Sequence, residues 1–248
     1  MFLRPNTIDS MIVDEIFGTN NYGLPEHFVT TLKKRSLSME RQCCIDVGAH
    51  IGVFALAAAQ RGAVVYAFEP HPENFKYLLK NTGNNPLIQS WNKAVWRSDI
   101  KEQVYILDDQ FPIMNESIPK YRNIQNTGAS VCSVTGKLAV ESIGLDEIID
   151  GAISDGFKKI DILKLDCEGS EFEILYTSSL LNKVDRIVGE LHASAFGGEI
   201  NGIIKGWREF CEYLVSRGFS EDTLYLKEYD HEATSKDDAR LFNFSIQR

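Results

Sequence analysis

The run Asp46-Val47-Gly48-Ala49-His50-Ile51-Gly52, followed by Ala67-Phe68-Glu69-Pro70, decides the fold of this 248-residue chain. An apolar run, Cys43-Cys44-Ile45, precedes the first segment, and a run rich in alanine, residues 53–59, follows it. This order predicts a strand, a glycine turn, a helix and a second strand that ends in an acid. Glycines allow close approach of the backbone, and the start of a helix offers unpaired N–H groups. The two segments therefore predict a ligand site at the ends of two strands.

The spacing of the glycines indicates which cofactor this turn binds. A dinucleotide site has Gly-x-Gly-x-x-Gly because a pyrophosphate sits on the helix N-terminus, whereas Gly48 and Gly52 are three residues apart and Ala55 follows. Asp46 would repel a pyrophosphate but attract an ammonium group. We therefore expect S-adenosylmethionine, with Asp46 and Gly48 facing its methionine part and Glu69 holding its ribose. An ordinary βα turn capped by Asp46 is the alternative.

Three further residues are expected to contact the cofactor. His50 lies within the glycine turn, and Asn92 and Ala94 follow the third predicted strand. Asn92 can hydrogen-bond the adenine, and Ala94 leaves room for its flat face. An ordinary turn residue is an equal alternative for Asn92. The other histidines are expected on the surface: His27, His71 and His231.

The chain divides into an N-terminal helical leader, residues 1–40, and a single domain, residues 41–248. Residues 8–17 and 25–34 carry helical spacing, and the leader can either cover a cofactor cleft or dock on the sheet edge. Strand and helix patterns alternate in the domain, which predicts an α/β fold with a doubly wound, mostly parallel sheet. The alternation breaks over residues 97–145, which predict an irregular insertion over the active-site edge.

The predicted elements follow the periodicity of the apolar residues. Core strands are expected at residues 43–47, 64–68, 87–91, 160–165 and 184–191, and helices at 51–61, 72–82, 145–149, 171–181 and 203–217. Short strands are expected in the insertion at 103–107 and 137–141. Residues 224–227 and 241–246 predict a C-terminal antiparallel hairpin, which is compatible with the methyltransferase variant of the doubly wound fold.

Polar residues follow the fourth and fifth predicted core strands. Asp166 and Glu168 end the fourth, and Glu190 and His192 end the fifth. Because open α/β sheets bind ligands beyond the carboxyl ends of their strands, we expect these four residues to be catalytic. Carboxylates there can bind a sulfonium, accept a proton or hold a cation, and His192 or Asp166 would take a proton from an alcohol. As an alternative, Glu168 only stabilises the N-terminus of the following helix through the helix dipole.

Several of these segments resemble the FkbM family of S-adenosylmethionine-dependent methyltransferases. They are residues 45–52, 67–72, 94–95, 145–146 and 163–171. The last of them, Leu163-Lys164-Leu165-Asp166-Cys167-Glu168-Gly169-Ser170-Glu171, looks like that family's Lys-Ile-Asp-Val-Glu-Gly-Ala-Glu signature. The resemblance runs from about residue 43 to residue 192, and departs at His50, where the family usually has Asn.

The resemblance implies a seven-stranded sheet of the class I methyltransferase (Rossmann-like) type. It also implies O-methylation, either of a sugar hydroxyl in a surface polysaccharide or glycolipid precursor, or of a natural product. By the same resemblance Asp166 and Glu168 would lie near the transferred methyl group. The residues that would bind the cofactor are Asp46, Gly48, Gly52 and Glu69. Residues 1–40 and 97–145 fall outside the strong match and would choose the substrate.

Three other hypotheses stay open. Asp166, Glu190 and His192 can hold a divalent metal that lowers the pKa of the hydroxyl, although their spacing neither requires nor forbids it. The domain can instead bind S-adenosylmethionine without turning it over, as a regulatory or assembly module. A nucleic-acid methyltransferase is the weakest reading, because the motif Asp/Asn-Pro-Pro-Tyr/Phe is absent.

Composition excludes several classes of partner. The formal net charge of −9 argues against a nucleic-acid backbone. No run reaches the roughly 20 apolar residues that span a bilayer, and the N-terminus has no signal-peptide pattern. The five cysteines include no C-x-x-C pair, which indicates a reducing compartment, so we expect a cytoplasmic protein. The expected partner is a small-molecule or saccharide hydroxyl, and a homo-oligomer is compatible with the sequence.

Overall fold

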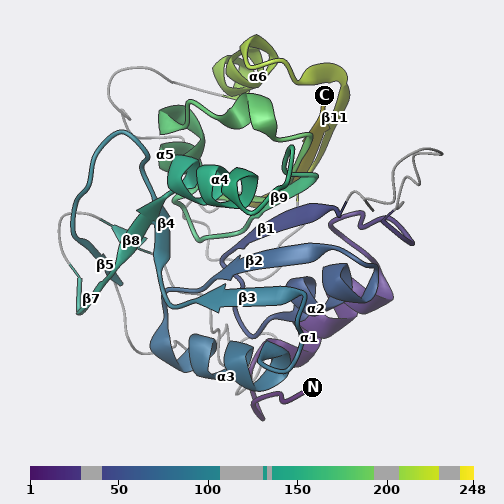
Figure 1. Ribbon diagram of the computed structural model, residues 1–248, viewed down its shortest axis with the longest axis vertical. Helices are drawn as coiled ribbons and strands as arrows, with labels where there is room; N and C mark the ends of the chain where they lie inside the picture. Colours follow the sequence, from purple (N-terminus) through teal and green to yellow (C-terminus); the bar gives the residue numbers. More distant parts are fainter. Residues whose placement is uncertain (29–40, 107–130, 133–135, 193–206, 229–240) are drawn as a thin grey trace.

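A seven-stranded sheet forms the centre of the computed structural model, which describes residues 1–28, 41–106, 131–132, 136–192, 207–228 and 241–248 (Figure 1). The strand order is β11-β12-β10-β9-β1-β2-β3. The strands are β1 (Cys43–Val47), β2 (Val64–Phe68), β3 (Ile88–Trp91), β9 (Ile162–Leu165), β10 (Arg186–His192), β11 (Ser220–Glu228) and β12 (Leu241–Gln247).

The pairing of the strands confirms the predicted fold class. Strands β3, β2, β1, β9 and β10 pair in parallel, and β12 pairs antiparallel with both β10 and β11. Parallel neighbours need crossover connections, which the helices supply. The fold is a mostly parallel class I methyltransferase sheet with a C-terminal antiparallel pair. Parallel pairing also brings the carboxyl ends of β1, β2, β9 and β10 to one edge of the sheet.

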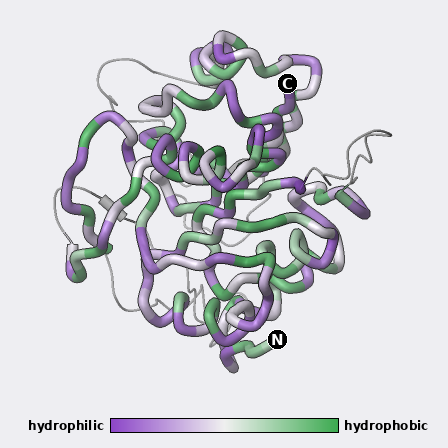
Figure 2. The backbone as a smooth tube through the Cα atoms, in the orientation of Figure 1, coloured by the Kyte–Doolittle hydropathy of each residue, from purple (hydrophilic) through white to green (hydrophobic). Residues whose placement is uncertain are grey.

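Helices cover both faces of the sheet (Figure 1). One face packs against α4 (Leu145–Ser154), α5 (Glu171–Thr177) and α6 (Trp207–Ser216), and the other against α2 (Val53–Gln60) and α3 (Pro72–Thr82). Alternate residues of β1 serve the two cores, with Ile45 on the first face and Cys44 on the second. Figure 2 shows hydrophobic stretches concentrated in the central strands. Each fully buried Ile or Leu contributes roughly 1.5–3 kcal/mol of transfer free energy.

Backbone conformation explains where the predicted helix boundaries were wrong. The helix expected from residue 51 begins at Val53, because Gly52 has a left-handed φ of +87°. The helix expected to end at 149 continues to Ser154, and its extension buries Ala152. The helix expected to reach 181 ends at Thr177, where the Ser178 hydroxyl turns away to donate to Asp146 at 2.5 Å.

The N-terminus of α3 shows how a local sequence sets a boundary. Pro72 occupies the first turn, where its missing N–H costs nothing. The His71 side chain caps the helix by accepting from the backbone N–H of Glu73 at 3.2 Å. The expectation that His71 lies on the surface is wrong, because the ring is 5% exposed in this capping position.

The leader packs on the α2 side of the sheet. It contains α1 (Asp9–Val13) and a π-helical turn, η1 (Asp14–Gly18), in place of the single helix expected over residues 8–17. Residues 25–28 are not helical, and the rest of the second helix expected in the leader lies outside the described residues. The leader's contribution to the core is apolar: Ile16, Tyr22, Leu24 and Phe28.

Part of the predicted insertion is regular. β5 (Val104–Ile106) pairs antiparallel with β6 (Val131–Cys132) and β7 (Leu138–Val140), close to the two short strands expected there. β4 (Ala94–Trp96) pairs in parallel with β8 (Ser142–Gly144), a pairing that the sequence did not predict. This small sheet returns the chain to α4 and so to the edge where β9 ends.

Candidate active site

A buried ion pair joins the ends of β1 and β9. Asp46 and Lys164 are cross-strand neighbours, and Asp46 Oδ1 lies 3.2 Å from Lys164 Nζ. Lys164 Nζ also donates to the carbonyl oxygens of Gly48 (2.7 Å) and Val47 (3.2 Å). Burial raises the pKa of Asp46, although Lys164 opposes this. The carboxylate that we expected to meet the cofactor's ammonium group therefore meets an ammonium group of the protein, and its cofactor contact stays a prediction.

The two glycines of the cofactor turn serve the protein's own packing. Gly48 has a φ of +71°, and a Cβ there would lie 1.8 Å from the carbonyl oxygen of Asp166. Gly52 would place a Cβ 2.7 Å from Leu78 and 2.8 Å from Thr82 on α3. Gly48 thus lets β1 approach β9, and Gly52 lets α2 approach α3. Their contact with a cofactor stays a prediction.

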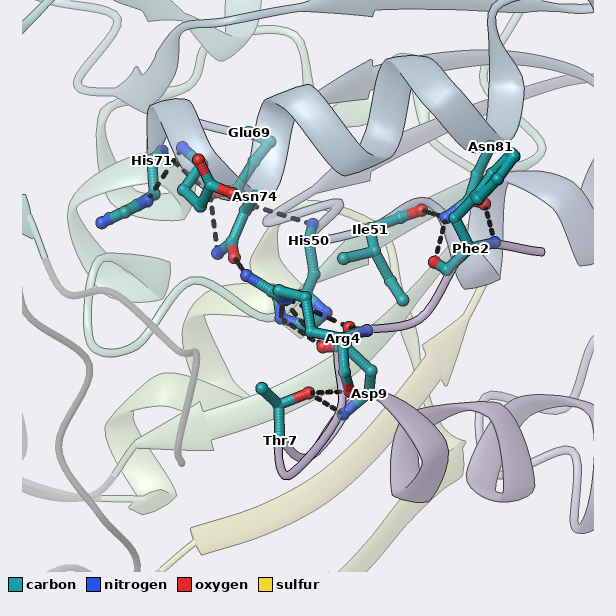
Figure 3. A network of polar contacts seen from close by, with 11 residues as sticks. Phe2, Arg4, Thr7, Asp9, His50, Ile51, Glu69, His71, Asn74 and Asn81 are labelled. Atoms are coloured by element: carbon teal, nitrogen blue, oxygen red, sulfur yellow. Dashed lines mark hydrogen bonds and ion pairs between the residues drawn. The ribbon is translucent and has the colours of Figure 1, made fainter. Parts of the chain in front are cut away.

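A network of polar contacts ties the leader to the glycine turn (Figure 3). Arg4 pairs with Asp9 at 2.7 Å, its Nη2 lies 2.9 Å from His50 Nε2, and its Nη1 donates to Asn74 Oδ1 at 2.7 Å. Burial lowers the pKa of His50 to about 3, so the neutral ring accepts from Arg4. His50 has a φ of +52°, a conformation in which Asn and His are both enriched, so its departure from Asn is compatible with the turn.

Glu69 ends β2 with its carboxylate held by protein donors (Figure 3). Its Oε2 accepts from the backbone N–H of His50 at 2.9 Å, and its Oε1 accepts from the backbone N–H of His71 at 2.9 Å and from Asn74 Nδ2 at 3.4 Å. The side chain is almost fully buried, and burial raises the pKa of Glu69 to about 7. The donors hold this acid in one orientation at the strand edge where a ribose was predicted.

Of the two residues predicted around the adenine, Asn92 lies beside Glu69. Asn92 Nδ2 donates to the carbonyl oxygens of Glu69 (2.8 Å) and Pro70 (2.9 Å), so an adenine contact would fall to the amide oxygen of Asn92. Ala94 is buried at the start of β4. The adenine contacts of both residues stay predictions.

Asp166 follows directly after β9, and its carboxylate lies near one donor from the leader and one from β9. Tyr22, in the leader, donates its hydroxyl to Asp166 Oδ2 at 3.0 Å, and Lys164 Nζ lies 3.5 Å from the same oxygen. Burial opposes the charged form, but Lys164, His192 and Tyr22 outweigh it and hold the pKa of Asp166 below its ordinary value. The Asp166 side chain is 27% exposed, so it is an ionised carboxylate that solvent or a ligand can reach.

His192 ends β10 between two carboxylates. Its Nδ1 lies 3.0 Å from Glu171 Oε1 and its Nε2 lies 3.3 Å from Glu168 Oε2. Burial opposes the charged ring, but Glu171 and Glu168 hold the pKa of His192 well above its ordinary value. In this arrangement His192 is an imidazolium with both nitrogens engaged.

The structure brings all four predicted catalytic residues together. Asp166, Glu190 and His192 each place one ligand atom so that the three atoms lie within 4.8 Å of one another, and Glu168 contacts His192. Burial, and then the nearby charge of Asp166, raise the pKa of Glu190 well above its ordinary value. Glu168 has a left-handed φ of +57°, which is uncommon for this residue type and is the kind of outlier that concentrates at functional sites.

Sequence reasoning did not predict several residues of this site. Lys164 and Glu171 lie inside the motif at residues 163–171. They are charged residues next to a predicted strand end, and this pattern could have identified them as site residues. Tyr22 and Arg4 reach the site from the leader, and no local pattern marks either of them. Only the folded chain brings residues so distant in sequence to the same strand ends.

The sequence of the chain matches a known protein family. The model of the methyltransferase FkbM domain matches residues 46–221, which is more than half of the chain. The chain belongs to the FkbM methyltransferase family. The match begins at Asp46, and so the leader with Arg4 and Tyr22 lies outside the matched part of this FkbM chain.

One curated relative of this FkbM chain is the hexuronic acid methyltransferase AglP of Haloferax volcanii. It is 28% identical over 149 residues, which are 60% of this chain and 55% of the relative, so the match spans just over half of the relative's length. Among solved structures, a human methyltransferase 10 domain containing protein is 14% identical with a TM-score of 0.45, covering 96% of this chain and 82% of that one.

A second solved structure is the fibrillarin pre-rRNA processing protein of Methanococcus jannaschii. It is 15% identical with a TM-score of 0.42, and covers 84% of this chain and 67% of that one. Both structural likenesses are too distant to inform the substrate. Among the described residues, this FkbM chain has no helix with the length and apolar character that a membrane crossing needs.

Proposed function

We propose that this protein transfers the methyl group of S-adenosylmethionine to a hydroxyl oxygen of a sugar. The observation that carries the proposal is the group of carboxylates and one imidazole at the ends of β9 and β10, next to the glycine turn after β1. Membership of the FkbM family supports methyl transfer. The hexuronic acid methyltransferase of Haloferax volcanii supports a sugar as acceptor.

The residues present suit this cofactor. S-adenosylmethionine supplies an activated methyl group on a sulfonium, and it carries positive charge and no phosphate. Acidic side chains dominate the strand ends, which favours such a cation over an anionic dinucleotide. Glu69, oriented by the backbone N–H groups of His50 and His71, would accept from the ribose hydroxyls. Asp166 and Glu168 would face the sulfonium end.

The proton of the acceptor hydroxyl has to leave as the new bond forms. Asp166 is ionised and partly exposed, so we assign it the role of proton acceptor. His192 is protonated between Glu171 and Glu168, and it could act as the base only after losing its own proton. In the arrangement seen, its positive charge stabilises the ionised form of Asp166. Most of the rate gain would come from aligning the hydroxyl behind the methyl group.

A transfer assay tests this proposal. The full chain is incubated with methyl-labelled cofactor and a panel of sugar nucleotides, including those of uronic acids, together with polysaccharide extracts. NMR of the product then identifies the methylated atom. We expect a methyl ether on a sugar. The Asp166→Asn variant should lower kcat by about 100-fold or more, in the range of lost acid–base catalysis.

Asp150→Asn is the matched control, because Asp150 is exposed on α4 and is not among the residues of the candidate site. It should turn over like the wild type. Methylation at nitrogen or carbon would contradict the O-directed reaction. Cofactor binding by calorimetry without transfer to any acceptor would instead support a regulatory or assembly module.

A further inference from the structure

We propose that Asp166, Glu190 and His192 form a binding site for one divalent cation, which orients the acceptor hydroxyl. This inference rests on the proposed methyl transfer, because it places the cation where the acceptor would bind. Such a site requires three ligands from two neighbouring strands, a histidine held in the correct orientation, and more negative than positive charge around the ion. The described residues meet each of these requirements.

The ligands converge because β9 and β10 are parallel neighbours. Gly189 and Leu165 are cross-strand partners. Asp166 therefore leaves the sheet beside Glu190, while β10 continues to His192 in pairing with β12. One atom each from Asp166, Glu190 and His192 lies within 4.8 Å of the others. Ligands about 2.1 Å from an octahedral ion lie up to about 4.2 Å apart, so small side-chain rotations would close the site.

The histidine is already oriented as a metal ligand would be. Glu171 is fully buried, and its Oε1 lies 3.0 Å from His192 Nδ1 while accepting from the backbone N–H groups of Cys167 (3.0 Å) and Gly169 (3.2 Å). Metal-bound histidines commonly donate their second N–H to a carboxylate in this way. The arrangement directs Nε2 toward the remaining carboxylates, where Glu168 now lies 3.3 Å away.

The local charge favours a cation. Four carboxylates surround this point, from Asp166, Glu168, Glu171 and Glu190, and Lys164 is shared with Asp46. Within the described ranges, no donor and no basic side chain holds the carboxylate of Glu190 at hydrogen-bond distance. This side chain nevertheless lies in the cluster with Asp166 and His192. A divalent cation would give Glu190 a partner and take the place of the proton on His192 Nε2.

The donor set indicates the class of ion. Carboxylate oxygens with one imidazole suit Mg²⁺, Mn²⁺ or Zn²⁺. Such an ion would leave positions for water and for a sugar hydroxyl or carboxylate. It would also lower the pKa of a bound hydroxyl, which is the chemistry that an alcohol acceptor needs.

Mn²⁺ titration followed by electron paramagnetic resonance tests the site directly. The full chain is stripped with EDTA and titrated with MnCl₂, first without and then with S-adenosylhomocysteine. We expect one bound Mn²⁺ per chain. Glu190→Gln and His192→Ala should each weaken Mn²⁺ binding at least tenfold, while Glu209→Gln, an exposed control on α6, should leave it unchanged.

Binding of S-adenosylhomocysteine by each variant shows that the variant is folded. Absence of stoichiometric Mn²⁺ binding, or equal binding by the wild type and both ligand variants, would overturn the metal site. Full methyl transfer after EDTA treatment would overturn it as well, while leaving the proposed reaction intact. Stoichiometric binding lost in both variants supports the site even if no acceptor is methylated.

Discussion

Two halves of the same sheet edge differ in how their polar groups are balanced. At the ends of β1, β2 and β3, the protein supplies partners for its own acids, with Lys164 beside Asp46 and three donors on Glu69. At the ends of β9 and β10, carboxylates outnumber the cations, and His192 lies between two of them. We call these the cradle half and the reactive half.

This difference suggests that the cradle half binds the cofactor and that the reactive half carries out the chemistry. A half whose groups are already hydrogen-bonded holds its geometry without a ligand and can select a cofactor by fit. A half in which carboxylates outnumber the cations is poised to bind a cation or move a proton. We therefore expect variants in the cradle half to change binding and variants in the reactive half to change turnover.

The largest effect is expected where the two halves meet, at Gly48. In Gly48→Ala the new Cβ would collide with the carbonyl oxygen of Asp166, 1.8 Å away, at a φ of +71°. We expect a loss of about 3 kcal/mol or more in the free energy of unfolding, measured by urea denaturation. Loss of both cofactor binding and turnover should accompany it.

Gly62→Ala is the matched control for Gly48→Ala. Gly62 has a φ of +99° but no atom within 4 Å of a built Cβ, so it reports the cost of the backbone conformation alone. We expect Gly62→Ala to lower the free energy of unfolding by about 1–2 kcal/mol. Equal losses in the two variants would show that the contact between β1 and β9 is not what requires a glycine at position 48.

The next largest effect is expected at His192 in the reactive half. His192→Ala should lower kcat by about 100-fold or more while leaving the Kd for S-adenosylhomocysteine within about twofold. His192→Gln keeps a donor for the buried Glu171 and should lose turnover as well, because the charge rather than the shape is removed. The measurements are steady-state kinetics and calorimetry.

His27→Ala serves as the control, because His27 is exposed. Normal turnover in both His192 variants would mean that neither proton transfer nor charge stabilisation depends on this ring. If the His192 variants also lose cofactor affinity, His192 contributes to cofactor binding, and the proposed division between the two halves is wrong at this residue.

A smaller effect is expected at Glu69. Glu69→Ala should weaken cofactor binding by about 1–3 kcal/mol, the size of a lost charge-assisted hydrogen bond. Because burial raises the pKa of Glu69 to about 7, the ionised acceptor forms as the pH rises through that value, and wild-type affinity should increase. Calorimetry at several pH values should show that Glu69→Ala removes this increase.

Glu73, at the start of α3, provides the control variant Glu73→Ala, because its side chain is 46% exposed and pairs with Lys76. It should keep both the affinity and its pH dependence. If Glu69→Ala binds the cofactor as tightly as the wild type, another group holds the ribose.

The smallest effect is expected at Tyr22, which links the leader to the reactive half. Tyr22→Phe removes one hydrogen bond to Asp166, so Asp166 should become slightly easier to protonate, and kcat should fall by roughly 3- to 10-fold, equivalent to about 1 kcal/mol. The pH profile of kcat should shift upward at its acid limb. A changed Km with an unchanged profile would instead assign Tyr22 to acceptor binding.

Much of the fold could be predicted from local patterns. The strands at 43–47 and 64–68 and the helix at 72–82 have the predicted bounds. Each strand is a short, fully buried and mostly apolar run, and the helix begins at Pro72 and ends before Gly83. Helix ends at Gly52 and Thr177 were misplaced, since they depend on a left-handed turn and on a contact with Asp146. Such contacts have no signature in the local sequence.

The sequence by itself determined the alternating α/β order, the acids at the strand ends and the family signature. These features depend on neighbours along the chain, whose spacing is visible without a fold. Only the tertiary structure decided that Asp46 faces Lys164, that Tyr22 reaches Asp166 and that His192 lies between Glu171 and Glu168. Those pairings depend on strand register and on burial, which set the pKa of each group and emerge only when distant segments pack together.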